Sequence, residues 1–458
     1  MSSLNATLAS ALSGLTAEQG ALAATTNNVA NVNTPGYSRE VPILVANDPI
    51  VESPLTFGTG VDLRTIQSIR DPILESQIQQ ETQTQGRLGA LVSALAQTDA
   101  SFTSTSGDIG TAISKFFDSI NQLSTSPADL ALRQNVLTAA GNVASAFNTA
   151  ANNLTHQRTS LDSSVEQVVG QINQLTAQIA QLNGKIGNLE NVGENAGTFI
   201  DQRTQLIDQL SSLVDVSVIP SDNTITLTTA SGTALVTGQQ SFTLATQLDS
   251  SGTQHIFAQG SDITSTLVSG QLGGLLAARD RQIPAIQSQL DTLTAGLANA
   301  VNNVQTNGYD LNGNASTGKV LFTAPPASGS GAAASLSVAF TDPALIAASS
   351  DGTAGSNGNA EILYALRNQA VIDGQNPTAY YSSIVFNVGN AAADANAEQS
   401  ASSLVLQQLN DQRSSVSGVS LDQEAANLMR YQQAYAASAQ VISTINSMMQ
   451  TVINMKNS

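Results

Sequence analysis

The sequence predicts a mainly α-helical protein, a long helical bundle or coiled coil with a small β-rich insertion, in which the N- and C-terminal helices pair. Apolar residues recur every seven positions at both ends of the chain and in its middle. Prolines are absent between Pro127 and Pro220 and after Pro377, while five fall in the stretch from Pro35 to Pro72. Because proline costs about 3 kcal/mol inside a helix, the proline-free stretches favour long helices and the proline-rich stretch favours loops and short strands.

The first predicted helix carries a coiled-coil seam at Leu8, Leu15, Leu22 and Val29. We expect this helix to end at the Thr-Pro-Gly sequence of residues 34–36. The residue before a proline avoids the helical conformation, and glycine admits a turn.

The last predicted helix has a matching seam. Its residues are Leu421, Leu428, Tyr435, Ile442 and Met449, with Ile445 at a second seam position. At about 1.5 Å per residue the stretches from Leu4 to Val32 and from Leu421 to Val452 span about 43 and 47 Å, so the helices can lie along one another. One such stripe alone would also fit an ordinary helix on its own core, but two matched stripes at opposite ends indicate pairing. These ten seam residues form the candidate assembly interface. Glu18 and Glu424 interrupt the seams, so we expect the terminal helices to order on assembly.

The elements between the two ends follow from the same signals. Residues 161–189 form the most regular seam and predict a long helical pair. Helices are also predicted at 73–100, 130–153, 199–214, 271–306 with a kink at Pro284, 359–372 and 391–417. Alternating Ser, Thr, Val and Ile indicate strands in 216–269, and the Gly-, Ala- and Ser-rich residues 308–358 predict loops with a strand at 334–340.

These elements suggest four parts of the chain. Residues 1–35 with 420–458 form the terminal coiled-coil assembly region, and residues 36–215 with 270–313 and 355–419 form the helical core domain. Residues 216–269 are the β-rich insertion, and residues 314–354 are a loop-rich segment.

The composition excludes several classes of function. The 34 acidic and 16 basic residues give a net charge of -18, which makes nucleic acid a poor partner. The chain has no cysteine and only two histidines, His156 and His255, so thiolate sites and closely spaced histidine ligand pairs are excluded. No apolar run approaches the ~18 residues of a membrane span. The first residues do not read as a Sec-type signal peptide.

No motif predicts a catalytic, cofactor or metal site. Residues 308–313 contain Asp310 between two glycines, but the spacing and the closing glutamate of a calcium loop are missing, which favours a turn after a helix. Acids near bases, as in Asp201 and Arg203 or Asp411 and Arg413, are expected to make local hydrogen bonds or intersubunit pairs. The sequence therefore predicts that the protein is not an enzyme.

One segment resembles a known signature. Residues 26–37, Thr-Asn-Asn-Val-Ala-Asn-Val-Asn-Thr-Pro-Gly-Tyr, are similar to the N-terminal signature of the bacterial flagellar rod, hook and hook-associated proteins. The residues that carry the motif are Asn28, Asn31, Asn33, Thr34, Pro35, Gly36 and Tyr37. Three further blocks, within 199–216, 270–310 and 418–439, resemble the hook-associated protein 1 family.

The resemblance implies an exported structural subunit at the junction between hook and filament, required for filament assembly. The partners it implies are further copies of the chain in a ring or tube, the hook protein, a second junction protein on the filament side, and an export chaperone at the C-terminal helix. It implies no cofactor, no nucleic acid and no membrane, type III export from the cytoplasm, and an extracellular place in the flagellum. Two alternatives remain open, another axial protein or flagellin-like filament subunit and, far behind, a secreted acidic hydrolase.

Overall fold

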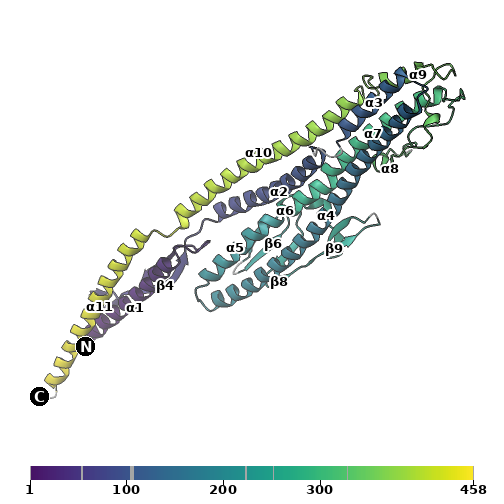
Figure 1. Cartoon of the computed structure of the whole chain (residues 1–458). Helices are drawn as coiled ribbons and strands as arrows, with labels where there is room; N and C mark the ends of the chain where they lie inside the picture. The colour runs from purple at the N-terminus through teal and green to yellow at the C-terminus, as the bar shows by residue number, and fades with distance from the viewer. Residues whose placement is uncertain are drawn as a thin grey trace.

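The computed structural model describes residues 2–52, 55–103, 108–221, 224–250, 252–326 and 329–456. It is an elongated, mainly helical molecule with both termini at one end (Figure 1). Helices α1 (Ser2–Ala30) and α11 (Leu421–Lys456) form that end and pack against each other. The predicted pairing of the terminal helices is confirmed.

The terminal helices run antiparallel. Asn28 of α1 lies against Glu424 near the start of α11, and Gly14 lies against Ser438 about four turns of each helix further along. After α1 the chain turns into a hairpin of β1 (Glu40–Ala46) and β4 (Val61–Ser68), whose tip holds β2 (Ile50–Glu52) and β3 (Leu55–Phe57). The hairpin lies on α1, and the proline-rich stretch thus forms short strands as predicted.

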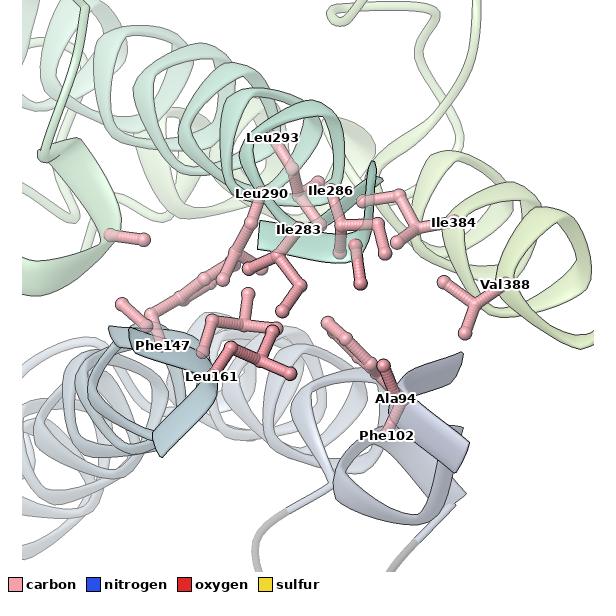
Figure 2. Packing of buried hydrophobic residues seen from close by; sticks show 14 of the residues in the cluster. Ala94, Phe102, Phe147, Leu161, Ile283, Ile286, Leu290, Leu293, Ile384 and Val388 are labelled. Atoms are coloured by element: carbon pink, nitrogen blue, oxygen red, sulfur yellow. The ribbon is translucent and has the colours of Figure 1, made fainter. Parts of the chain in front are cut away.

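A helical core follows the hairpin. Its helices are α2 (Pro72–Thr103), α3 (Ile109–Thr125), α4 (Leu130–Asn191), α5 (Gly197–Leu213), α6 (Gly270–Ala277), α7 (Ile283–Asn307), α8 (Ala332–Ser335), α9 (Gly358–Ala365) and α10 (Pro377–Ser417). Figure 2 shows buried side chains from α2, α4, α7 and α10 meeting in one cluster, among them Phe102, Phe147, Leu290 and Ile384. This packing fixes α10, which leads directly to α11, against the core.

Helix α4 is continuous over 62 residues, where the sequence predicted separate helices at 130–153 and 161–189. No proline or glycine lies in residues 154–160, and Leu154, Gln157 and Leu161 are buried there, so nothing interrupts the helix. The side chain of Asp129 caps its start by accepting from the backbone N–H groups of Ala131 and Leu132.

The predicted β-rich insertion lies between α5 and α6. It contains β5 (Ser217–Ser221), β6 (Thr224–Thr228), β7 (Ala234–Thr237) and β8 (Gln240–Ser241) in one sheet, and β9 (Leu244–Leu248), β10 (Gln254–Ala258) and β11 (Ser261–Asp262) in another. Two asparagines of α4 hold these sheets: Asn173 exchanges hydrogen bonds with the backbone of Leu244, and Asn183 donates to the carbonyls of Ile225 and Gly238. A 3₁₀ turn, η1 (Thr264–Thr266), closes the insertion.

Several local predictions differ from the structure. The strand predicted at 334–340 is reduced to a single β-bridge between Val338 and Phe322. The backbone N–H groups of Gly331 and Ala333 are bonded to Asp291 and start the short helix α8 before it. Helix α9 ends at Ala365, earlier than predicted, and the 3₁₀ turn η3 (Pro343–Leu345) lies in the loop-rich stretch. Helix α3 lies outside every predicted range. Near Pro284, where a kink was predicted, the helix is interrupted by a π-helical turn, η2 (Ala278–Gln282), directly before α7.

Candidate assembly interface

The seam residues predicted from the heptads occupy different environments in the subunit. Ile445 is buried, whereas Val29 and Leu421 are 40% and 52% exposed. The remaining seam residues are partly buried on the paired helices, namely Leu8, Leu15, Leu22, Leu428, Tyr435, Ile442 and Met449. The α1–α11 pair alone therefore leaves much of both seams accessible.

Helix α1 buries a second face that the heptad pattern did not identify. Ala17, Ala21 and Ala24 are at most 2% exposed, and Thr25 and Asn28 follow on the same face. This face is covered by the hairpin and by α11. Small side chains allow both elements to approach closely, and a repeat of alanines at spacings of four and three was the available signal in the sequence.

The outer side of α11, meaning the part of its surface that the rest of the subunit leaves uncovered, carries exposed apolar side chains. They are Met429, Val441, Met448, Val452, Ile453 and Met455, each more than 40% exposed. Between Tyr431 and Met455 the helix has no charged residue. Exposed apolar surface of this extent on a long helix is typical of a protein interaction site.

The motif residues lie at the elbow where the terminal pair meets the core. The side chain of Asn28 is 1% exposed and donates to the carbonyl of Glu40 at 2.8 Å and to the Glu424 carboxylate at 3.2 Å. Its oxygen accepts from the backbone N–H of Glu40 at 2.8 Å and from the Tyr37 hydroxyl at 2.9 Å. The amide thus joins the end of α1 to the hairpin and to α11.

The rest of the motif shapes the turn after α1. Asn31 donates to the backbone carbonyl and the side chain of Asn27, and Thr34 donates to Asn31. Gly36 has φ +77°, a left-handed conformation that glycine adopts without strain. Asn33, Thr34, Pro35 and Gly36 are exposed at the surface of the turn.

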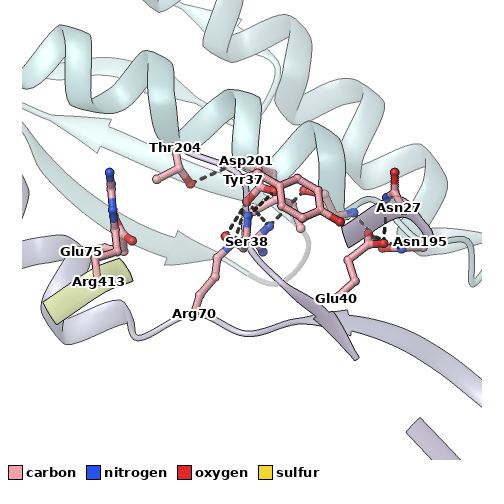
Figure 3. Close-up of polar contacts among 12 residues, drawn as sticks. Asn27, Tyr37, Ser38, Glu40, Arg70, Glu75, Asn195, Asp201, Thr204 and Arg413 are labelled. Atoms are coloured by element: carbon pink, nitrogen blue, oxygen red, sulfur yellow. Dashed lines mark hydrogen bonds and ion pairs between the residues drawn. The ribbon is translucent and has the colours of Figure 1, made fainter. Parts of the chain in front are cut away.

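Asp201 on α5 ties this turn to the core, as Figure 3 shows. Its carboxylate accepts from the backbone N–H of Ser38 at 3.0 Å, from the Ser38 hydroxyl at 2.7 Å and from Arg70 Nη2 at 2.6 Å. Burial and the carboxylates of Glu40, Asp201 and Glu424 raise the pKa of Tyr37 well above its usual value, which keeps its hydroxyl protonated as a donor to Asn28.

A second polar contact holds the C-terminal end of α10. Arg413 Nη1 lies 3.4 Å from Asp208 Oδ2 on α5 and 3.6 Å from Glu75 Oε2 on α2. Burial and the neighbouring Glu75 raise the pKa of Asp208 to about 6, although Arg413 opposes the shift, and burial likewise raises the pKa of Glu75. The prediction that Asp201 and Arg413 act locally or between subunits is wrong, because both form long-range contacts within the subunit.

A cleft of about 510 Å³ opens between the motif turn and the core. Its walls include Tyr37, Arg70, Asp201 and Arg413, together with residues 417–419 that connect α10 to α11.

Among the residues that the structure describes, no three His, Asp or Glu side chains form a group able to hold a metal ion. In the same part of the chain, no helix has the length and hydropathy to cross a membrane.

Three family models match the chain. Residues 95–322 match the flagellar hook-associated protein FlgK helical domain, residues 8–37 the flagella basal body rod protein, and residues 411–455 the flagellar basal body rod FlgEFG protein C-terminal region. The two terminal matches cover the motif turn and the paired helices, and the first covers most of the core.

Relatives match over nearly the whole chain. The flagellar hook-associated protein 1 of Escherichia coli K12 is 28% identical over 542 aligned positions, which cover 97% of this chain and 99% of the relative. The protein of the same name from Bacillus subtilis 168 is 28% identical and covers 98% of this chain and 97% of its own length. A solved structure, that of the flagellar hook junction protein FlgK from Burkholderia pseudomallei, has a TM-score of 0.65 at 20% identity and covers 74% of this chain and all of its own. At that identity the likeness supports the fold.

The paired terminal helices, the motif turn and the matched terminal models define an axial protein of the bacterial flagellum. Within that class the chain belongs to the flagellar hook-associated protein 1 family, the hook–filament junction proteins. It is a structural flagellar component.

Proposed function

We propose that the subunit builds the junction between hook and filament through its terminal helical pair, with α11 and the accessible seam of α1 packing against neighbouring copies. The observation that carries this proposal is the uncharged, apolar outer side of α11, which the subunit's own helices leave uncovered. In a ring or tube of identical copies this face meets a different face of the next subunit's pair, so its burial is repeated in every subunit.

The candidate interface residues fit this arrangement in two groups. Leu428, Ile442 and Ile445 pack α11 onto α1, while the exposed Val29 and Leu421 are free to contact a neighbour. The four-part division of the chain fits it as well. The terminal region would assemble, the helical core would carry it, and the β-rich insertion and the loop-rich segment would lie away from the paired helices.

The partners follow from the position of the junction. One end of the ring would contact the hook protein and the other a second junction protein on the filament side. An export chaperone would cover the apolar side of α11 before the chain leaves the cytoplasm by type III export to its extracellular place. No catalytic role is proposed, since the polar side chains at the elbow are engaged in holding the fold.

Deletion of the gene in the source bacterium tests the proposal. We expect hooks without filaments and flagellin released into the medium, with both defects reversed by the intact gene. Normal filaments in the deletion strain would contradict a junction role. Indefinite filaments of the purified chain would instead favour a filament subunit.

A further inference from the structure

Glu424 is a buried charge within the terminal helical pair. It is 1% exposed, although it lies in the first turn of a helix whose outer side faces solvent. Arg39 Nε donates to its Oε1 at 2.9 Å, and Asn28 Nδ2 donates to its Oε2 at 3.2 Å. Both partners come from the N-terminal region of the chain, so this contact fixes one point of α11 against α1 and the hairpin.

The side-chain amide of Asn28 has no hydrogen-bonding position left for a different partner. A side-chain amide offers two N–H donors and an oxygen with two lone pairs, and here all four positions are engaged, by Glu40, Tyr37 and Glu424. Moving Glu424 away would leave a buried N–H and a buried carboxylate unpaired, and both are unfavourable.

The apolar seam does not select one alignment. Leu8, Leu15 and Leu22 recur every seven residues on α1, and Leu428, Tyr435 and Ile442 recur every seven on α11. A slip by one heptad therefore places large apolar residues opposite large apolar residues again. The connection from α10 to α11 is residues 418–420, and unwinding a helical turn on either side of it would supply the length for such a slip.

We propose that Asn28, Arg39 and Glu424 are positioning residues that set the register of the α1–α11 pair. In the observed register Glu424 lies opposite Asn28, whereas a slip of one heptad places it opposite Ala21, which offers no polar side chain. A single buried polar contact is known to specify register in coiled coils, where the apolar seam alone is degenerate. The register in turn fixes where the outer apolar residues of α11 stand along the subunit, in steps of about 10 Å per heptad.

Disulfide trapping tests this register because the chain has no cysteine of its own. A Cβ built on Gly14 lies 3.4 Å from Ser438 Oγ, so Gly14→Cys with Ser438→Cys reports the observed register. Gly14→Cys with Tyr431→Cys reports a slip of one heptad, because these positions are offset by about 10 Å in the observed register, beyond the reach of a disulfide. Both pairs are oxidised in isolated flagella and, in parallel, in the purified full chain.

The expected result is that the observed-register disulfide predominates, and that Glu424→Gln lowers its ratio to the slipped disulfide about tenfold. Asp422→Asn is the matched control, since Asp422 is a carboxylate in the same first turn of α11 but is exposed to solvent; it should leave the ratio unchanged. A residue that only stabilises the pair would lower both disulfides together. Either that result or an unchanged ratio in Glu424→Gln would overturn the proposal. Incorporation into flagella is scored separately, so a failure of the proposed junction role is distinguishable from a loss of register.

Discussion

Ser38 donates both its backbone N–H and its hydroxyl to the carboxylate of Asp201, 163 positions later in the chain. This pair of bonds joins the motif turn to α5 of the core. Arg70 donates to the same carboxylate from Nε and Nη2 and also to the carbonyl of Gly197. The elbow between the terminal pair and the core is therefore a charged hydrogen-bond network and not an apolar contact.

Asp201→Ala is expected to destabilise the chain by about 1–3 kcal/mol, because it leaves the Arg70 guanidinium and the Ser38 N–H without their acceptor. Denaturant unfolding of the purified chain measures the change. Arg70→Ala and the double variant complete a thermodynamic cycle, in which a coupling energy above about 0.5 kcal/mol is expected for groups in contact. Additive effects of the two substitutions would mean that the ion pair contributes nothing to the elbow.

The long helices could be predicted from the sequence, but the hydrogen-bond network at the elbow could not. Seven-residue repeats such as Leu8 to Leu15 involve residues close together in the chain and indicate a helix with one buried face. The long helices and the pairing of the two ends were therefore predictable. The contact of Arg70 with Asp201 spans 131 positions and depends on how α2 and α5 meet, which periodicity does not encode. Helix α3 shows the opposite case: Ile109, Ile113 and Phe116 repeat at helical spacing, so the sequence carries a local signal for this helix although it lies outside the predicted ranges.

One glycine where α2 packs against its neighbours and one on the exposed side of α4 give a matched pair of tests. A Cβ on Gly86 would lie 2.1 Å from the carbonyl oxygen of Ser212, a backbone atom that cannot rotate away. A Cβ on Gly170, inside α4, would meet nothing within 4 Å. Gly86→Ala is therefore expected to destabilise the chain by about 1–3 kcal/mol. Gly170→Ala should stabilise it by about 0.5–1 kcal/mol. Thermal unfolding of both variants is the measurement, and equal midpoints would show that α2 does not pack as closely as described.

The stability of the core is expected to fall as the pH rises from about 4 to about 6. Burial raises the pKa of Asp215 from its usual 3.8 to about 6, and burial together with the neighbouring Glu75 raises the pKa of Asp208 to about 6. The folded state then holds these protons more tightly than the unfolded state, so the stability they give at low pH is lost across this window. For Asp215, which is 1% exposed, the loss is at most about 3 kcal/mol.

Asp215→Asn checks this assignment, because an amide does not titrate. The variant should show a flatter dependence of its unfolding midpoint on pH between 4 and 7 than the parent chain, whatever the constant effect of the substitution. The pKa values of Asp108 and Asp310 are lowered, so these two residues change the stability only below about pH 4, outside the compared range. Parallel pH curves for variant and parent would show that Asp215 is ionised throughout.

The seam of α11 gives the sharpest test of the assembly role. Leu428→Asp together with Ile442→Asp places two carboxylates on the face that meets α1, and each replaces about 1.5–3 kcal/mol of apolar burial with a desolvation cost in every assembled subunit. We expect the double variant to be excluded from flagella and its cells to swim no better than the deletion strain. Gln407→Asp with Gln412→Asp adds the same charge at exposed positions of α10, outside the apolar side of α11, and should assemble better than the seam variant.

The melting behaviour of the same variant separates assembly from folding. Both seam residues are only partly buried in the subunit, and the large core cluster contains neither of them. The main unfolding midpoint of the purified chain should therefore fall by less than about 5 °C, since about 1 kcal/mol shifts a domain of 150 to 250 residues by roughly 2–4 °C. A larger fall would place the seam in the cooperative core of the subunit. Normal motility of the cells would remove the seam from the assembly interface altogether.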